Sequence, residues 1–474
     1  MQPASERVGP IVTAPALALT EPTPAPVASR AAHALAREVW NLAWPAITHM
    51  LLITTVFFTG RVLVGRYSPT ALASLQISGT LTWTVYSLFT AFSAATLAVV
   101  ARSTGAGDRE SAARATRASM MFAFAIGIVV AAAFLIANGA FLRLLFPRAG
   151  ADVLHQASAY MHIVVPLLPL AFVEATAAAA LQGSGDTRTP LYVASVGSVV
   201  NVALSAALVF GKFGFPEMGV RGAAIGAAST MAVEGLILTA FLFSKRSPLP
   251  LRDVRAVLVF PAFRRVARVA LPAFGEKVVY HGAYLAFVAI IGLLGAAAMA
   301  ANQGLISIEA VSFLSADGFG VAAAAMVAQK LGKKRPEEAL VAGQLSAGFA
   351  TVALTTFGIF FAVAPRALAS IFSDDPAIID LGAQTLLVAA VAQPFMAYAT
   401  VIGMALRGAG DTKTVLLVMT VCSFAVRLAA TWFFAVTLGM GLVGVWMGSG
   451  ADWFVRSIWL GILWRRGNWK AATA

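Results

Sequence analysis

Several ionisable side chains of this chain lie inside long apolar stretches, where a charge is costly. Six of them are candidates for coupling-ion or substrate binding: Glu174, Glu234, Glu276, Glu309, Asp317 and His281. A charge at the centre of a membrane helix costs about 2.5–3.5 kcal/mol on insertion scales, so its presence indicates a function. A desolvated carboxyl group can hold a proton and release it when a cation arrives. These residue types therefore predict exchange of protons against another cation.

Glu276 is the strongest of these candidates for a role in coupling. It follows Pro272 and Gly275, where a helix is easily broken and backbone carbonyls are freed beside the carboxylate. The alternative is a fixed ion pair with the neighbouring Lys277. Adjacent residues point about 100° apart on a helix and do not face each other, which disfavours that pair. A role in coupling is the favoured interpretation of Glu276.

The other candidates keep two interpretations open. Glu309 and Asp317 are separated by about two helical turns and share roughly one face, where either they bind a cation or nearby serines satisfy them. Glu174 and Glu234 either line a cavity that attracts cations or make packing contacts between alanine-rich helices. His281 either relays protons beside Glu276 or simply packs. No histidine in an apolar stretch has a second ligand at metal spacing on its helix, so no metal site is expected.

Composition makes the chain a membrane protein. Hydrophobic residues are 59% of it and charged residues only 12%, against about 25% charged residues in soluble domains. Apolar stretches of roughly 20 residues recur along its length, and in a bilayer such stretches must be helices. We predict an all-α membrane protein with twelve transmembrane helices. They are expected at 38–60, 71–100, 118–142, 158–181, 190–210, 222–243, 270–294, 301–328, 339–364, 380–406, 414–438 and 441–463.

The polar segments divide the chain into five parts. We expect a disordered tail over 1–35, a six-helix bundle over 36–243, a linker over 244–269, a second bundle over 270–464 and a tail over 465–474. Apolar residues spaced among the arginines of the linker predict an amphipathic helix on the membrane surface. Most of the 34 Lys and Arg residues fall on the side that holds both termini. The termini are therefore expected in the cytoplasm, and the net charge of +13 indicates topology rather than nucleic-acid binding.

An internal repeat relates the two bundles. Residues 181–188, Leu-Gln-Gly-Ser-Gly-Asp-Thr-Arg, correspond to residues 406–413, Leu-Arg-Gly-Ala-Gly-Asp-Thr-Lys. Six spans per half is an even number, so both halves insert in one orientation and a pseudo-two-fold axis follows the membrane normal. Neither loop has the Lys-Ser/Thr pair of a phosphate-binding loop. A structural role is expected, with glycines in the turn and an aspartate capping the next helix. These structural residues are Gly183, Gly185, Asp186, Gly408, Gly410 and Asp411.

These features together resemble the multidrug and toxic compound extrusion (MATE) family. The resemblance rests on the paired loops, on Leu271-Pro272-Ala273-Phe274-Gly275-Glu276, on the stretch 211–222 and on their order over about 36–464. It implies two six-helix bundles around a V-shaped cavity and export of organic cations in exchange for protons or sodium. Many bacterial members carry an aspartate in span 1, where this chain has Gly60, and another branch carries one in span 10, where this chain has Met396.

The sequence therefore predicts a secondary exporter of organic cations that works by alternating access in a bacterial inner membrane, and not an enzyme. Protons are the preferred coupling ion, with sodium as the alternative and no other cofactor; a monomer is expected because two halves complete the cavity. A flippase for lipid-linked oligosaccharides is the first rival, but it needs a basic cavity. A membrane enzyme would need a clustered His, Asp, Glu or Ser constellation, which the sequence lacks.

Overall fold

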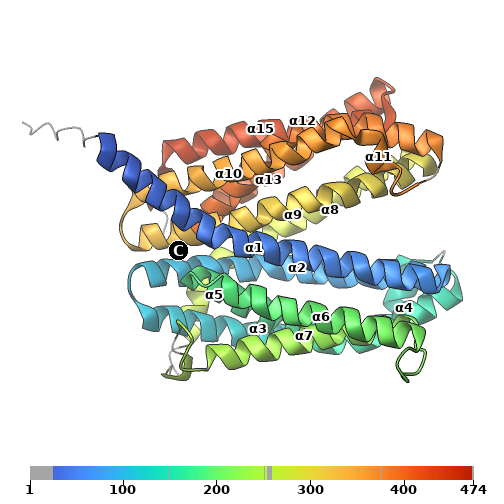
Figure 1. Ribbon diagram of the computed structural model, residues 1–474, viewed down its shortest axis with the longest axis horizontal. Helices are drawn as coiled ribbons and strands as arrows, with labels where there is room; N and C mark the ends of the chain where they lie inside the picture. The colour runs from blue at the N-terminus through green and yellow to red at the C-terminus, as the bar shows by residue number, and fades with distance from the viewer. Residues whose placement is uncertain (1–24, 148, 250, 254–258, 374, 472–474) are drawn as a thin grey trace, which may run out of the picture.

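The computed structural model describes residues 25–147, 149–249, 251–253, 259–373 and 375–471, and over these residues it contains helices and no strand (Figure 1). The all-α prediction is confirmed. The first half holds α1 (Ala25–Tyr67), α2 (Pro69–Gly105), α3 (Arg109–Leu145), α4 (Ala151–Val164), α5 (Leu168–Ser184), α6 (Arg188–Phe210) and α7 (Val220–Leu242). The second half holds α8 (Val259–Leu293), α9 (Ala296–Gly332), α10 (Pro336–Val363), α11 (Pro365–Ala369), α12 (Pro376–Ala409), α13 (Thr412–Val421), α14 (Ala429–Trp432) and α15 (Gly441–Arg466).

Eleven helical segments of the described chain are long and apolar enough to cross a bilayer. One combines α4 and α5, which a short 3₁₀ turn at Val165–Leu167 joins, and another runs from α13 through α14 to Thr437. The remaining long helix, α15, has 26 residues but carries Asp452 and Arg456 in its apolar middle. The described helices thus correspond to the predicted spans.

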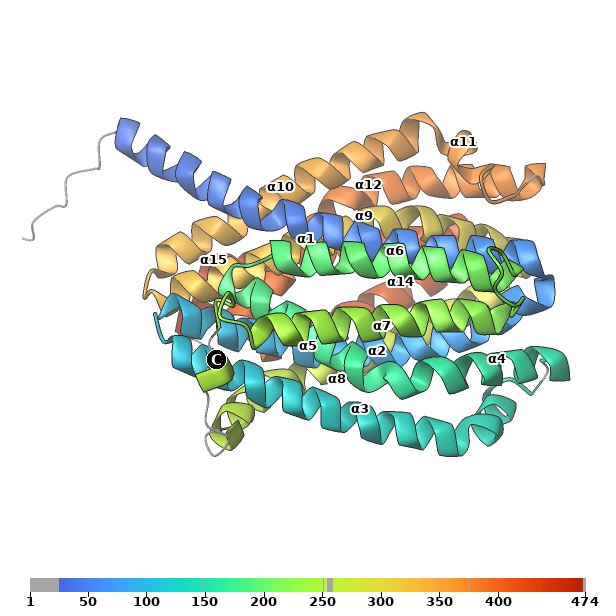
Figure 2. The same ribbon diagram turned by 60° about the horizontal axis from the view of Figure 1, so that its bottom comes forward.

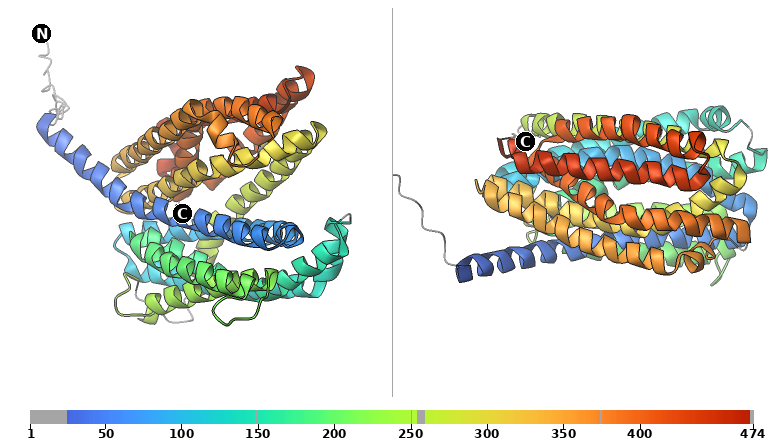
Figure 3. Two further views of the ribbon diagram at one scale, coloured as in Figure 1. Left: turned by 45° about the vertical axis from the view of Figure 1, so that its right-hand side comes forward. Right: turned by 90° about the horizontal axis from the view of Figure 1, so that it is seen from above.

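The helices of each half run side by side along the long axis of the molecule (Figures 1 and 2). The start of α1 and the end of α15 lie at the same end, which we call the terminal end. Away from it the helices of the two halves spread apart (Figure 3, left). The position of the bundles therefore depends on contacts near the terminal end.

Close helix packing at the terminal end follows the internal repeat. A Cβ at Gly105 of α2 would collide with the carbonyl of Gln329 on α9, and a Cβ at Gly332 of α9 would collide with the carbonyl of Arg102 on α2. Small residues let helix backbones approach closely in membranes. The two contacts are related by the pseudo-two-fold of the repeat.

Polar contacts between the halves follow the same symmetry. The Gln329 amide donates to the carbonyl of Gly183 at 2.8 Å, and the Arg102 guanidinium donates to the carbonyl of Ala409 at 3.5 Å. Each half therefore reaches into the repeat loop of the other. An ion pair of 3.0 Å between Lys330 and Glu38 adds a further link.

Two predicted boundaries differ from the structure. Helix α1 begins at Ala25, inside the expected tail over 1–35, of which residues 1–24 lie outside the described part. The helix that we expected in the linker corresponds to the first part of α8, which begins at Val259. Residues 254–258 of the linker lie outside the described part. Its Val266 is fully buried and its Phe263 ring lies 4.7 Å from that of Phe122 on α3. Part of the apolar face of this segment thus packs on the first half.

Candidate functional site

The first half contains two carboxyl groups in an apolar setting. Glu174 on α5 is 9% exposed and accepts a hydrogen bond of 3.5 Å from the Tyr86 hydroxyl on α2. The Glu234 side chain on α7 fills the space beside Gly197 of α6, and the charge of Glu174 acts on it. Within the described residues neither glutamate forms an ion pair with Lys, Arg or His. Three helices therefore bring two acids together without a base.

A neutral polar network lies one helical turn from Glu234. The Asn201 amide on α6 donates to the Thr230 hydroxyl on α7 at 3.0 Å, and that hydroxyl lies 3.0 Å from the Gly226 carbonyl. Ser205 donates to the Asn201 side chain at 3.4 Å. The sequence interpretation missed these residues, although an asparagine within an apolar stretch is itself a signal of a polar contact.

Glu276 has a partner that the sequence interpretation did not assign to it. The carboxylate is 2% exposed and forms a bidentate ion pair with Arg407, in which Arg407 Nε donates to Oε2 at 2.9 Å and Nη2 contacts Oε1. Arg407 lies in the second repeat loop, at the terminal end of α12. The pair therefore ties α8 to α12 near the terminal end, and Lys277 is not the ion-pair partner.

The two acids of α9 lie in different surroundings. The charge of Arg427 acts on Glu309, whereas the charges of Lys277 and Arg407 act on Asp317. The serines that could have satisfied them donate to backbone instead, Ser312 to the carbonyl of Glu309 and Ser315 to that of Val311. The structure thus brings Asp317 toward the Glu276–Arg407 pair and leaves Glu309 with Arg427.

His281 links the two halves. Its Nε2 lies 3.2 Å from the Ser87 hydroxyl, so it joins α8 of the second half to α2 of the first half. Ser87 is the residue that follows Tyr86, the hydrogen-bond partner of Glu174. The second half also holds a charged cluster in which Asp452 forms ion pairs with Arg456 and with Arg427, at 2.7 Å each.

The repeat loops form turns and helix caps. Gly185 and Gly410 have φ of +98° and +92°, a conformation that favours glycine. Asp186 accepts from the backbone N–H of Thr189 at 2.9 Å, and Asp411 accepts from that of Thr414 at 3.3 Å. Close approach explains the other two glycines, because a Cβ at Gly183 or Gly408 would collide with a neighbouring backbone.

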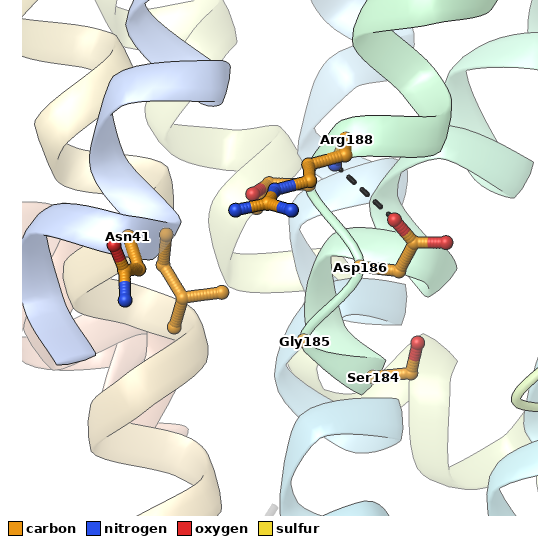
Figure 4. Close-up of a pocket in the computed structure, with 7 residues that line it drawn as sticks. Asn41, Ser184, Gly185, Asp186 and Arg188 are labelled. Carbon is orange, nitrogen blue, oxygen red and sulfur yellow. Dashed lines mark hydrogen bonds between the residues drawn. The ribbon is translucent and has the colours of Figure 1, made fainter.

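A recess lies between the first repeat loop and α1 (Figure 4). Its volume is about 470 Å³, and the labelled residues that line it are Asn41, Ser184, Gly185, Asp186 and Arg188. None of the six candidate side chains lines it. The recess therefore belongs to the loop and not to the buried charges.

The chain is similar to known proteins along both halves. The MatE family model matches residues 45–207 and 272–433, one stretch in each half. The "Probable multidrug resistance protein NorM" of Thermotoga maritima is 29% identical over 436 residues, covering 92% of this chain and 93% of that protein. The protein of the same name from Pseudomonas putida is 30% identical over 426 residues, covering 87% and 90%.

Solved structures share the fold. An outward-facing MATE family transporter of the MOP superfamily has a TM-score of 0.85 at 19% identity, covering 93% of this chain and 97% of that one. A MOP superfamily transporter from Pyrococcus furiosus has a TM-score of 0.85 at 18% identity with the same coverage. The apolar helices and bacterial relatives indicate a multi-pass protein of the bacterial inner membrane. The chain therefore belongs to the MatE family of multidrug efflux transporters and is not an enzyme.

Proposed function

We propose that this protein exports organic cations in exchange for protons, with Glu174 and Glu234 as the coupling carboxylates. The observation that supports this most directly is that the buried Glu174 and the half-buried Glu234 lie on two helices that pack together, α5 and α7, and that neither has a basic ion-pair partner among the described residues. Two negative charges in an apolar bundle are costly unless a proton or another cation neutralises them. Protons and an organic cation would therefore compete for the same two side chains.

The surroundings of Glu276 favour a structural role instead. Its charge is already neutralised by the bidentate contact with Arg407, so it has no need of a proton or a cation. The coupling role that the sequence favoured for Glu276 thus moves in this proposal to the first half. This chain has Gly60 and Met396 at the two positions where other family members carry an aspartate. Met396 is 1% exposed in an apolar core, which is consistent with a coupling site elsewhere in this chain.

Transport would follow from rocking of the two halves. We place the terminal end in the cytoplasm because most Lys and Arg residues lie in its loops. With the halves in contact there and spread apart at the other end, this conformation corresponds to the state that loads protons and releases the exported cation. A monomer is sufficient for this cycle.

The test uses purified protein in liposomes with an imposed proton gradient, to which ethidium is added while internal pH is recorded. We expect ethidium to dissipate the gradient with the wild type, and Glu174→Gln and Glu234→Gln to abolish this response. Glu217→Gln, an exposed acid of the same half, is the matched control. Retained coupling in both cluster variants would contradict the assignment of the site. If the wild-type response requires sodium, then sodium and not the proton is the coupling ion.

A further inference from the structure

Three arginines near the start of α8 lie at exposed positions. Arg264, Arg265 and Arg268 are exposed, whereas Val266 and Val269 between and beside them are 0% and 3% exposed. The two valines belong to the apolar core of the first half. This part of α8 therefore packs one side on the first half and turns a basic side outward.

Two of the arginines are direct neighbours on one face of the helix. Arg264 and Arg268 are four residues apart, a spacing at which side chains on a helix meet. Like charges in this arrangement destabilise a helix. An anion that contacts both guanidinium groups removes this repulsion, so the pair favours a bound anion.

The acids of the protein do not supply that anion. Within the described residues none of the three arginines forms an ion pair. The charge of Arg265 acts on Asp108 in the loop before α3, and Asp108 also accepts a hydrogen bond of 2.8 Å from the Ser111 N–H. Arg264 and Arg268 are left without an acid over the part of the chain that the structure describes.

The same face of α8 continues as an apolar, exposed stripe. Leu271 is 72% exposed, Leu285 72% and Leu293 69%. Leu271 and Leu293 are separated by about 33 Å along the helix at 1.5 Å per residue, close to the roughly 30 Å of a bilayer's hydrocarbon core. Arg268 precedes Leu271 by about 5 Å on the same scale. The arginines therefore lie at the level of the lipid headgroups when the stripe faces the acyl chains.

The first half has no equivalent pair of arginines. The two stretches that match the family model begin at Pro45 of α1 and at Pro272 of α8, so these helices correspond to each other. In this register Arg268 corresponds to Asn41, which is neutral. The basic pair is thus a feature of the second half and not a requirement of the repeated fold.

We propose that Arg264 and Arg268 bind the phosphate group of an anionic phospholipid in the leaflet at the terminal end, with its acyl chains along the stripe that begins at Leu271. The planar guanidinium group matches a phosphate in a bidentate manner. Basic clusters beside a membrane helix attract anionic headgroups. The side chains bind the lipid, and the site is independent of the substrate and of the coupling ion.

The test measures lipid binding to detergent-purified protein by native mass spectrometry, without any gradient. Phosphatidylglycerol and phosphatidylcholine with the same acyl chains are titrated separately, and the lipid-bound fraction gives an apparent dissociation constant for the first lipid. We expect the wild type to bind phosphatidylglycerol about tenfold more tightly than phosphatidylcholine. Equal affinities for the two lipids would overturn the proposal.

The double variant Arg264→Gln/Arg268→Gln should weaken phosphatidylglycerol binding about tenfold and leave phosphatidylcholine binding unchanged. Arg264→Lys/Arg268→Lys keeps both charges and should retain most of the preference. In detergent without added lipid the glutamine variant should melt close to the wild type, because both positions are exposed. Unchanged phosphatidylglycerol binding in the glutamine variant would contradict the proposed site.

The control removes the same charge from another place at the terminal end. Arg465→Gln/Arg466→Gln replaces two exposed arginines at the end of α15 and should bind phosphatidylglycerol like the wild type. An equal loss of binding in this variant would mean that net charge alone attracts the lipid, and the site on α8 would be refuted.

A competition experiment identifies the source of the phosphate. Inorganic phosphate and glycerol 3-phosphate are added at the concentration of the bound lipid, and neither should displace phosphatidylglycerol, since neither has acyl chains to lie along the apolar stripe. Displacement by either compound at that concentration would show a site for soluble phosphates and would overturn the lipid assignment.

Discussion

Glu276 and Arg407 form a buried ion pair between α8 and α12. The burial of this pair determines how much a substitution of either residue lowers the free energy of unfolding. Removing one partner of such a pair typically costs about 3–5 kcal/mol, because the other charge stays buried and uncompensated. We expect Glu276→Gln to lower the free energy of unfolding by about that amount, visible as a lower melting temperature in detergent. The double variant Glu276→Leu/Arg407→Met should recover most of the loss, since replacing both charges by apolar groups is often neutral.

The control for this prediction is Arg264→Gln, which removes an exposed charge from the same helix, α8, without touching the ion pair. It should melt close to the wild type. A Glu276→Gln variant that melts like the wild type but no longer couples protons to ethidium would return the coupling role to Glu276, as the sequence suggested.

The buried charges could be identified from sequence because their cost in an apolar stretch is a local property. Their partners could not, since Arg407 is 131 residues from Glu276 and Tyr86 is 88 residues from Glu174. Lys277 is the basic residue nearest to Glu276 in the sequence, but the ion-pair partner of Glu276 in the structure is Arg407. Long-range packing decided that Glu276 is neutralised and that Glu174 is not.

The helices themselves were predictable, because a bilayer demands about 20 apolar residues and satisfied backbone hydrogen bonds. Two features were not. The apolar face of Phe263 and Val266 suits a lipid surface and a protein groove equally, so its packing against Phe122 had no sequence signal. The π-helical turn at Cys422–Leu428 lies within an apolar stretch whose sequence pattern does not distinguish it from a regular α-helix.

The close packing of α2 against α9 predicts that a larger residue at the contact lowers the stability of the protein. In Gly332→Ala the new methyl group would meet the carbonyl of Arg102, which is rigid backbone. Overpacking of this kind typically costs about 1–3 kcal/mol. We expect a lower melting temperature for Gly332→Ala. Gly348→Ala on α10 is the matched control, because no atom lies within 4 Å of its added Cβ and alanine favours a helix. Equal melting temperatures for the two variants would contradict the close approach.

Across the whole molecule, the repeat makes the two halves hold each other at the terminal end. Arg102 and Gln329 occupy equivalent positions, and each donates to a carbonyl in the repeat loop of the opposite half. The paired loops thus have a role beyond turning the chain. In the proposed rocking cycle, opening of the terminal end has to break both contacts, whereas the spread of the halves at the other end leaves them intact.

Gln329→Ala removes one of these two contacts and should shift the balance between the conformations. A neutral hydrogen bond contributes about 0.5–1.5 kcal/mol, which changes an equilibrium about two- to tenfold. Spin labels at the exposed positions Arg109 and Lys334, in a Cys422→Ala background, report the separation of the halves at the terminal end. We expect a larger population at long distance in Gln329→Ala, while Gln344→Ala, an exposed glutamine on α10, should match the wild type. An unchanged distance distribution in Gln329→Ala would mean that the Gln329 contact does not help to hold the terminal end closed.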